Sequence, residues 1–130
     1  MSTDLRYLAY TAMLTAVLWL PYIVALVMTN GGVSATNYTD PTPPTLPNWG
    51  KRANRVFMNA VESFAPFAAL VLIAQAAGKA DATTALLSVA FFWTRVAHAV
   101  VYWLGIPFIR TLVFGLSFAC VVGMFVEVIK

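Results

Sequence analysis

Four long apolar segments make up most of the sequence, and they decide which solvent the chain folds in. A helix rises about 1.5 Å per residue, so roughly 20 residues cross a hydrocarbon core about 30 Å thick. Hydrophobic residues fill 61% of the 130 positions and charged residues 10%, with a mean hydropathy of +0.80. A water-soluble domain of this size cannot bury so much apolar surface. The sequence therefore predicts an all-α integral membrane protein, a four-helix bundle with helices over residues 7–28, 52–77, 82–104 and 108–129.

The connections predict how these helices alternate across the membrane. Residues 29–51 hold four closely spaced prolines and are typical of an exposed loop, because proline cannot continue a helix. The link after Gly78 is short and polar, so the third helix should return antiparallel beside the second. Pro21 is expected to kink the first helix. We expect one domain over residues 1–130, with its helices running up, down, up and down.

The distribution of basic residues predicts the orientation in the membrane. One side carries Lys51, Arg52, Arg55 and Arg110 against a single acid, Asp40. On the other side the basic residues Arg6, Lys79 and Lys130 are balanced by Asp4, Asp81 and Glu127. The positive-inside rule then places the first and third loops in the cytoplasm and both termini outside. The net charge of +3 is spread along the chain rather than gathered in a patch, which argues against nucleic-acid binding.

Polar residues of the second helix fall in one stripe. Arg55, Asn59, Glu62 and Pro66 follow one another at spacings of four, three and four, so they share one helix face. If Arg52 marks the membrane interface, Glu62 lies roughly 15 Å inside, near the middle of the hydrocarbon core. A carboxylate at this depth indicates a functional site.

The third helix carries a matching polar face. Arg95, His98 and Tyr102 are spaced by three and four. Because the second and third helices are antiparallel, Arg95 and Glu62 should lie at similar depths. We therefore expect an intramembrane salt bridge between them, since either charge alone in lipid would cost at least ~3 kcal/mol.

Several of these residues also have purely structural interpretations. His98 alone is more typical of a hydrogen-bonded interior histidine than of a metal ligand, because the sequence holds no second histidine and no cysteine nearby. Asn59 could donate a hydrogen bond between helices, and Tyr102 could be an interface aromatic. Arg52 and Arg110 could extend to the lipid headgroups as interfacial residues. We expect no metal.

These structural interpretations do not explain the excess of positive charge. Arg55, Arg95 and Arg110 bring three positive charges, whereas Glu62 is the one intramembrane acid expected near them. Such a cluster is stable if an anion completes it. The expected ligand is a small molecule with carboxylates that enters from the cytoplasmic side.

Three short motifs resemble those of one membrane family. The pattern Arg55-x-x-x-Asn59-x-x-Glu62-x-x-x-Pro66 resembles the second-helix signature of the MAPEG family, the membrane-associated proteins in eicosanoid and glutathione metabolism. Arg95-Val-Ala-His98-x-x-x-Tyr102 is similar to that family's third-helix segment, closest to microsomal prostaglandin E synthase. Arg110-Thr111 is similar to the Arg-Ser pair that opens the fourth helix. The resemblance covers the whole chain and suggests a bacterial-type member, in the inner membrane.

The resemblance implies a homotrimer that holds glutathione, as a cosubstrate, at each subunit interface. Glutathione would lie along Arg55, Asn59, Glu62, Arg95, His98 and Tyr102, and Arg110 would stabilise its thiolate. A thiol with a pKa near ~8.5 is more readily ionised beside a guanidinium. The thiolate could then attack a lipophilic electrophile or reduce a lipid hydroperoxide, which implies a glutathione-dependent transferase or peroxidase.

Two other functions compete with this one. The first is a non-catalytic lipid-binding or scaffold protein of the same fold, since one branch of the family binds lipid without glutathione catalysis. The second is a small four-helix proton-coupled exporter. That class needs an acid inside the first helix, and the interior of residues 7–28 contains none.

Overall fold

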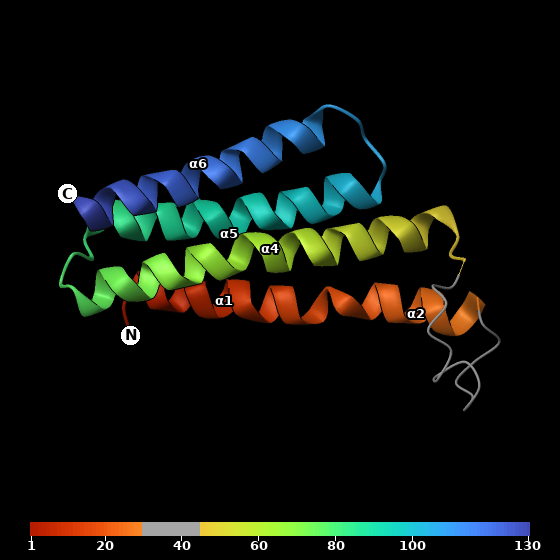
Figure 1. The fold of residues 1–130 in the computed structure, drawn as a ribbon, viewed down its shortest axis with the longest axis horizontal. Coiled ribbons are helices and arrows are strands. Elements are labelled where there is room, and N and C mark those ends of the chain that lie inside the picture. Colours follow the sequence, from red (N-terminus) through yellow and green to blue (C-terminus); the bar gives the residue numbers. More distant parts are fainter. Residues whose placement is uncertain (30–44) are drawn as a thin grey trace.

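Residues 1–29 and 45–130 are described by a computed structural model, and within these ranges the chain is helical, with no strand. The helices are α1 (Thr3–Val17), α2 (Trp19–Thr29), α4 (Asn48–Ala76), α5 (Ala82–Trp103) and α6 (Ile109–Ile129). α2 continues beyond α1, so the five helices form four rods that run in alternate directions, with both termini at one end (Figure 1). Each rod is long and apolar enough to cross a membrane. The predicted integral membrane protein with four spanning helices is confirmed.

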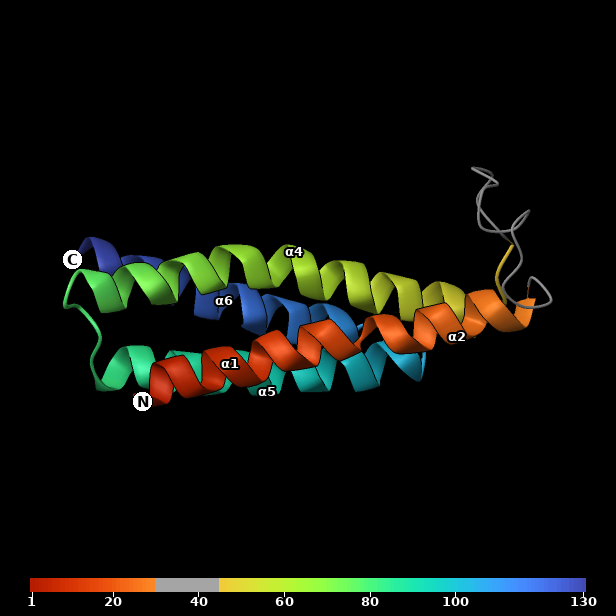
Figure 2. The same cartoon turned by 90° about the horizontal axis from the view of Figure 1, so that it is seen from below.

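The first span is interrupted at Leu18 rather than continuous. Pro21 has no N–H, so the carbonyl of Val17, four residues earlier, lacks its α-helical donor. α1 accordingly ends at Val17 and α2 begins at Trp19. Figure 2 shows the two helices following one path from end to end of the bundle. The kink that was expected from Pro21 is therefore a one-residue break just before it.

The second span begins earlier than predicted. α4 begins at Asn48, not at Arg52, so the end of the expected loop 29–51 is helical. Pro47 has an extended backbone at the N-cap, and its carbonyl accepts the first helical hydrogen bond from the Lys51 N–H at 3.0 Å. A proline there loses nothing, because the first N–H groups of a helix have no partner in any case. Residues 30–44 of the predicted loop lie outside the described residues.

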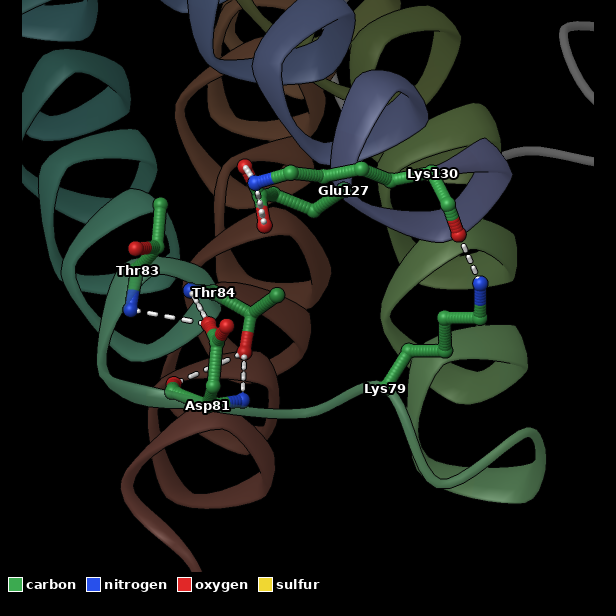
Figure 3. Close-up of polar contacts among 6 residues, drawn as sticks. All are labelled: Lys79, Asp81, Thr83, Thr84, Glu127 and Lys130. Carbon is green, nitrogen blue, oxygen red and sulfur yellow. Dashed lines mark hydrogen bonds and ion pairs between the residues drawn. The ribbon is translucent and has the colours of Figure 1, made fainter.

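Glycine and aspartate set the other helix ends. Gly78 and Gly105 adopt positive φ angles of 67° and 71° just beyond α4 and α5, as expected of helix-ending glycines. Asp81 caps α5: its Oδ1 accepts from the Thr83 and Thr84 N–H groups at 2.9 and 3.0 Å, and the Thr84 hydroxyl accepts from the Asp81 N–H at 2.8 Å. Figure 3 shows this capping box.

The same end of the bundle holds the ion pair of the described residues. Lys130 Nζ lies 3.3 Å from Glu127 Oε1, and Lys79 Nζ donates to the Lys130 carbonyl (Figure 3). The link between α4 and α5 is therefore attached to the end of α6.

The interior has two apolar clusters. One consists of Phe67, Val71, Phe91, Cys120 and Met124, and the other of Leu18, Val56, Ala60 and Ala99. The Phe67 and Phe91 rings stack with centroids 3.9 Å apart. Along α5, Arg95 lies between Phe91 of the first cluster and Ala99 of the second. The bundle therefore has a polar layer between two apolar ones.

Candidate functional site

Arg95 is the centre of the polar layer. Its side chain comes from the middle of α5 and is only 3% exposed. Nη2 donates to Asn59 Oδ1 on α4 at 2.6 Å and lies 3.3 Å from His98 Nδ1 one turn along α5. Nη1 donates to Ser117 Oγ on α6 at 3.4 Å. One guanidinium therefore joins three helices through neutral partners.

One donor of this guanidinium has no partner. Arg95 Nε is fully enclosed and makes no hydrogen bond within the part of the chain that the structure describes. No carboxylate pairs with Arg95 there either, since the salt bridge of those residues is the one between Lys130 and Glu127. A buried charge without a counter-ion is costly, so this site favours an anion.

Ser117 and Thr94 belong to this layer, although the sequence motifs did not include them. Ser117 is 1% exposed; its hydroxyl donates to Thr94 Oγ1 at 3.0 Å and lies 3.2 Å from the Val113 carbonyl oxygen. The sequence does contain a pattern that could have identified Ser117. It follows Arg110 by seven residues, so it lies two turns along the same face of a mostly apolar helix.

Tyr102 and Arg110 extend the site toward the end of α5 and the start of α6. The Tyr102 ring lies 5.6 Å from the His98 ring, and the Arg110 guanidinium lies 5.0 Å above the centre of the Tyr102 ring. The distance from Arg110 to the ring is that of a cation–π contact. Arg110 is exposed in the first turn of α6, where the side chain of the N-cap residue Phe108 supplies no capping hydrogen bond. Asn59, Arg95, His98, Tyr102 and Arg110 thus form one continuous chain of contacts.

Glu62 does not join this chain, and the expected salt bridge to Arg95 is not formed. Glu62 is exposed, and Arg95 bonds Asn59 instead. The two positions differ by three residues, or about 4.5 Å along the helix axis. Depth alone could not separate them, because a step of three residues changes the depth only slightly and also turns the side chain by about 60° around the helix axis. Arg55 is exposed as well, on the same stripe of α4.

The start of α4 is fixed to the end of α5 by a different arginine. Arg52 Nε donates to the Trp103 carbonyl at 3.2 Å, so this side chain binds a helix end of its own chain at the surface. Beside it lies an apolar groove of about 260 Å³, lined by Pro21, Trp49, Ala53 and Trp103. None of the seven candidate residues lines this groove.

The described residues offer no metal-binding cluster. Within residues 1–29 and 45–130, no three side chains among histidine, cysteine, aspartate and glutamate lie close enough to hold an ion.

The chain was also compared with known protein families, curated proteins and solved structures. A sequence model of the MAPEG family matches residues 7–130. The chain belongs to the MAPEG family. No curated protein and no solved structure matched it. MAPEG proteins are known for glutathione-dependent transferase, peroxidase or related activities, which gives the polar layer a chemical context.

Proposed function

We propose that this MAPEG protein is a membrane-bound, glutathione-dependent transferase or peroxidase. Its substrates would be lipophilic electrophiles or lipid hydroperoxides dissolved in the membrane. Glutathione is the cosubstrate. We propose that it lies along six residues: Arg55, Asn59, Glu62, Arg95, His98 and Tyr102.

The observation that carries the proposal is the buried Arg95. Its guanidinium is held by neutral groups of α4, α5 and α6, and no carboxylate of the described residues neutralises it. Arg110 adds a second positive charge, which is linked to Arg95 through Tyr102 and His98. An anionic ligand is the chemical complement of such a site.

The positions of Arg55 and Glu62 support a homotrimer. Glu62 is the middle residue of α4 and is exposed on a single chain. An ionised side chain at the centre of a spanning helix would cost about 3 kcal/mol or more if it faced lipid. A neighbouring subunit packed against this stripe of α4 would cover both charges and would close a binding cleft between the two chains.

Arg110 is the proposed catalytic residue. It lies beside the uncapped N-terminus of α6, and both the guanidinium and the helix dipole stabilise negative charge. A glutathione thiolate placed there would be the nucleophile, with the lipid phase supplying the electrophile at its side. We place the site toward the cytoplasm of a bacterial inner membrane, where the first and third loops carry the excess of positive charge.

The decisive experiment is a glutathione titration of the purified protein in detergent, followed by the ultraviolet absorbance of the thiolate. Wild-type protein is expected to give a saturable thiolate signal. Arg110→Ala should bind glutathione but lose most of that signal. Lys79→Ala, which removes a cation at the opposite end of the bundle, is the control and should behave as wild type.

The same titration tests the competing lipid-binding or scaffold function. A wild-type protein with no saturable glutathione binding would overturn the proposed enzyme. Glutathione binding without a thiolate signal would leave a binding protein with no activated nucleophile.

A further inference from the structure

The two N–H groups of Arg95 Nη2 face two different side chains. One is directed at Asn59 Oδ1, 2.6 Å away on α4, and the other at His98 Nδ1, 3.3 Å away on α5. Each of these partners has one end that accepts hydrogen bonds and another that can donate them. Arg95 therefore controls which end of each side chain is left for a ligand.

The chemistry of arginine fixes both choices. A guanidinium only donates, so the His98 Nδ1 that faces it must accept and can carry no proton. The imidazole is then neutral, with its proton on Nε2. For the same reason the carbonyl end of the Asn59 amide faces Arg95, and the two N–H groups of Nδ2 face away from it.

We propose that Arg95 is a positioning residue that presets Asn59 and His98 as paired hydrogen-bond donors. Their Nδ2–H and Nε2–H groups are held ready for a ligand that presents acceptors, such as a carboxylate or a peptide carbonyl. Resting on the proposed function, this ligand is glutathione, and Arg95 acts on it chiefly through these two neighbours.

The surroundings of Arg95 support this role. The guanidinium is 3% exposed and its Nη1 is held by Ser117, so it has little freedom to turn outward. The fully enclosed and unpaired side-chain atoms of the described residues are Asp4 Oδ2 and Arg95 Nε. His98 is likewise 3% exposed, and no hydrogen bond among the described residues uses its Nε2.

The first test is the tautomer of His98, measured without glutathione. His98 is the one histidine of the sequence, so ¹⁵N-histidine labelling gives a single pair of ring signals for the full-length protein in lipid bilayers. We expect a protonated Nε2 and an unprotonated Nδ1 at neutral pH. A spectrum of the Nδ1–H tautomer or of the imidazolium would overturn the inference, whatever the protein binds.

Arg95→Met tests whether Arg95 is the cause. Methionine keeps much of the side-chain volume but has no donor, so the second tautomer should appear in the spectrum. A variant that folds and keeps the pure Nε2–H form would overturn the assignment to Arg95. If it does not fold, the wild-type spectrum and the following variant still decide.

Asn59→Asp separates positioning from structural support. Aspartate keeps the Oδ1 acceptor for Arg95 but replaces the donor end with a second acceptor. We expect an unchanged His98 spectrum and a rise of roughly tenfold or more in the dissociation constant for glutathione. Asn54→Asp, which adds the same charge to another face of α4, is the matched control and should leave the affinity unchanged.

Equal affinities of Asn59→Asp and wild type would overturn the role of Asn59 as a donor. A wild-type protein that does not bind glutathione would instead overturn the proposed function. In that case the His98 spectrum still decides the inference about Arg95.

Discussion

Phe108 holds a backbone conformation that side chains with a Cβ rarely adopt. Among the described residues it is the non-glycine residue with positive φ, at 65° with ψ of −51°. The Ile109 N–H donates to the Pro107 carbonyl at 2.7 Å, which closes a tight three-residue turn around it. The side chain is 87% exposed, so packing does not compensate for the strain. The turn sets where α6 begins, and hence where Arg110 stands.

Phe108→Gly should therefore stabilise the protein. Glycine has no Cβ to clash at positive φ, so the free energy of unfolding should rise by about 1 kcal/mol. Unfolding by denaturant in detergent micelles measures this change. Phe108→Ala keeps the Cβ and is the control; an equal gain in both variants would show that loss of the exposed ring, not backbone strain, is responsible.

Residue-scale contacts also show where sequence reasoning stops. The stripe of Arg55, Asn59 and Glu62 was readable from spacing, and so was the face shared by Arg95 and His98. The spacing did not predict which residue of the stripe contacts Arg95, because neighbours one turn apart differ by only about 5 Å in depth. Ser117 was missed because a lone serine in an apolar helix is usually satisfied by its own backbone.

At the scale of elements, the helix ends follow from local chemistry. Gly78 and Gly105 follow α4 and α5 with positive φ, whereas α1 and α4 began earlier than the apolar runs suggested. Polar first turns explain the difference: Ser2 caps α1 by accepting from the Leu5 N–H at 3.3 Å, and Pro47 opens α4. Hydropathy marks the part of a helix in lipid, not the part outside it.

The cap of α5 can be tested by a matched pair of substitutions. Asp81→Ala removes the acceptor of the Thr83 and Thr84 N–H groups and should cost about 1 kcal/mol of stability. Asp81→Asn keeps a side-chain oxygen in place and should cost much less. Denaturant unfolding of both variants compares them; equal losses would mean that the charge of Asp81, rather than its capping bonds, matters.

The packing of α2 against α4 depends on one glycine. A Cβ on Gly50 would lie 2.7 Å from Ala25 Cβ, which is buried in the facing helix. Gly50→Ala should therefore push the helices apart and destabilise the protein by about 1–3 kcal/mol. Gly115→Ala on α6 meets nothing within 4 Å and should be neutral or gain up to about 1 kcal/mol from helix propensity. Similar losses at both sites in a thermal-stability assay would contradict the close approach.

At the scale of the whole molecule, the bundle explains why the chain buries some charges and exposes others. Arg95 is enclosed by three helices of its own chain, whereas Arg55 and Glu62 are exposed on the outside of α4. The number of spans and their alternation were predictable, because length and apolarity decide them. What covers the exposed charges was not predictable, since the spacing of residues within one chain does not say what its outer face contacts.

The bundle also makes the predicted orientation testable. Both termini lie at one end, and the start of α4 lies at the other, where the basic residues outnumber the acids (Figure 1). The one native cysteine, Cys120, is buried in the core and should not react with a membrane-impermeant thiol reagent. The protein without added cysteines should therefore give no labelling signal and can serve as the background.

Single cysteines placed at Ser2 and at Asn48 then report on the two ends. In spheroplasts of a bacterial host, Ser2→Cys should be labelled while the cells are intact, because the termini are expected outside. Asn48→Cys should be labelled only after lysis, since the positive-inside rule places the more basic end in the cytoplasm. The reverse pattern would put Arg110 and the proposed glutathione site on the outer side, away from the cytoplasm from which the cosubstrate is expected to enter.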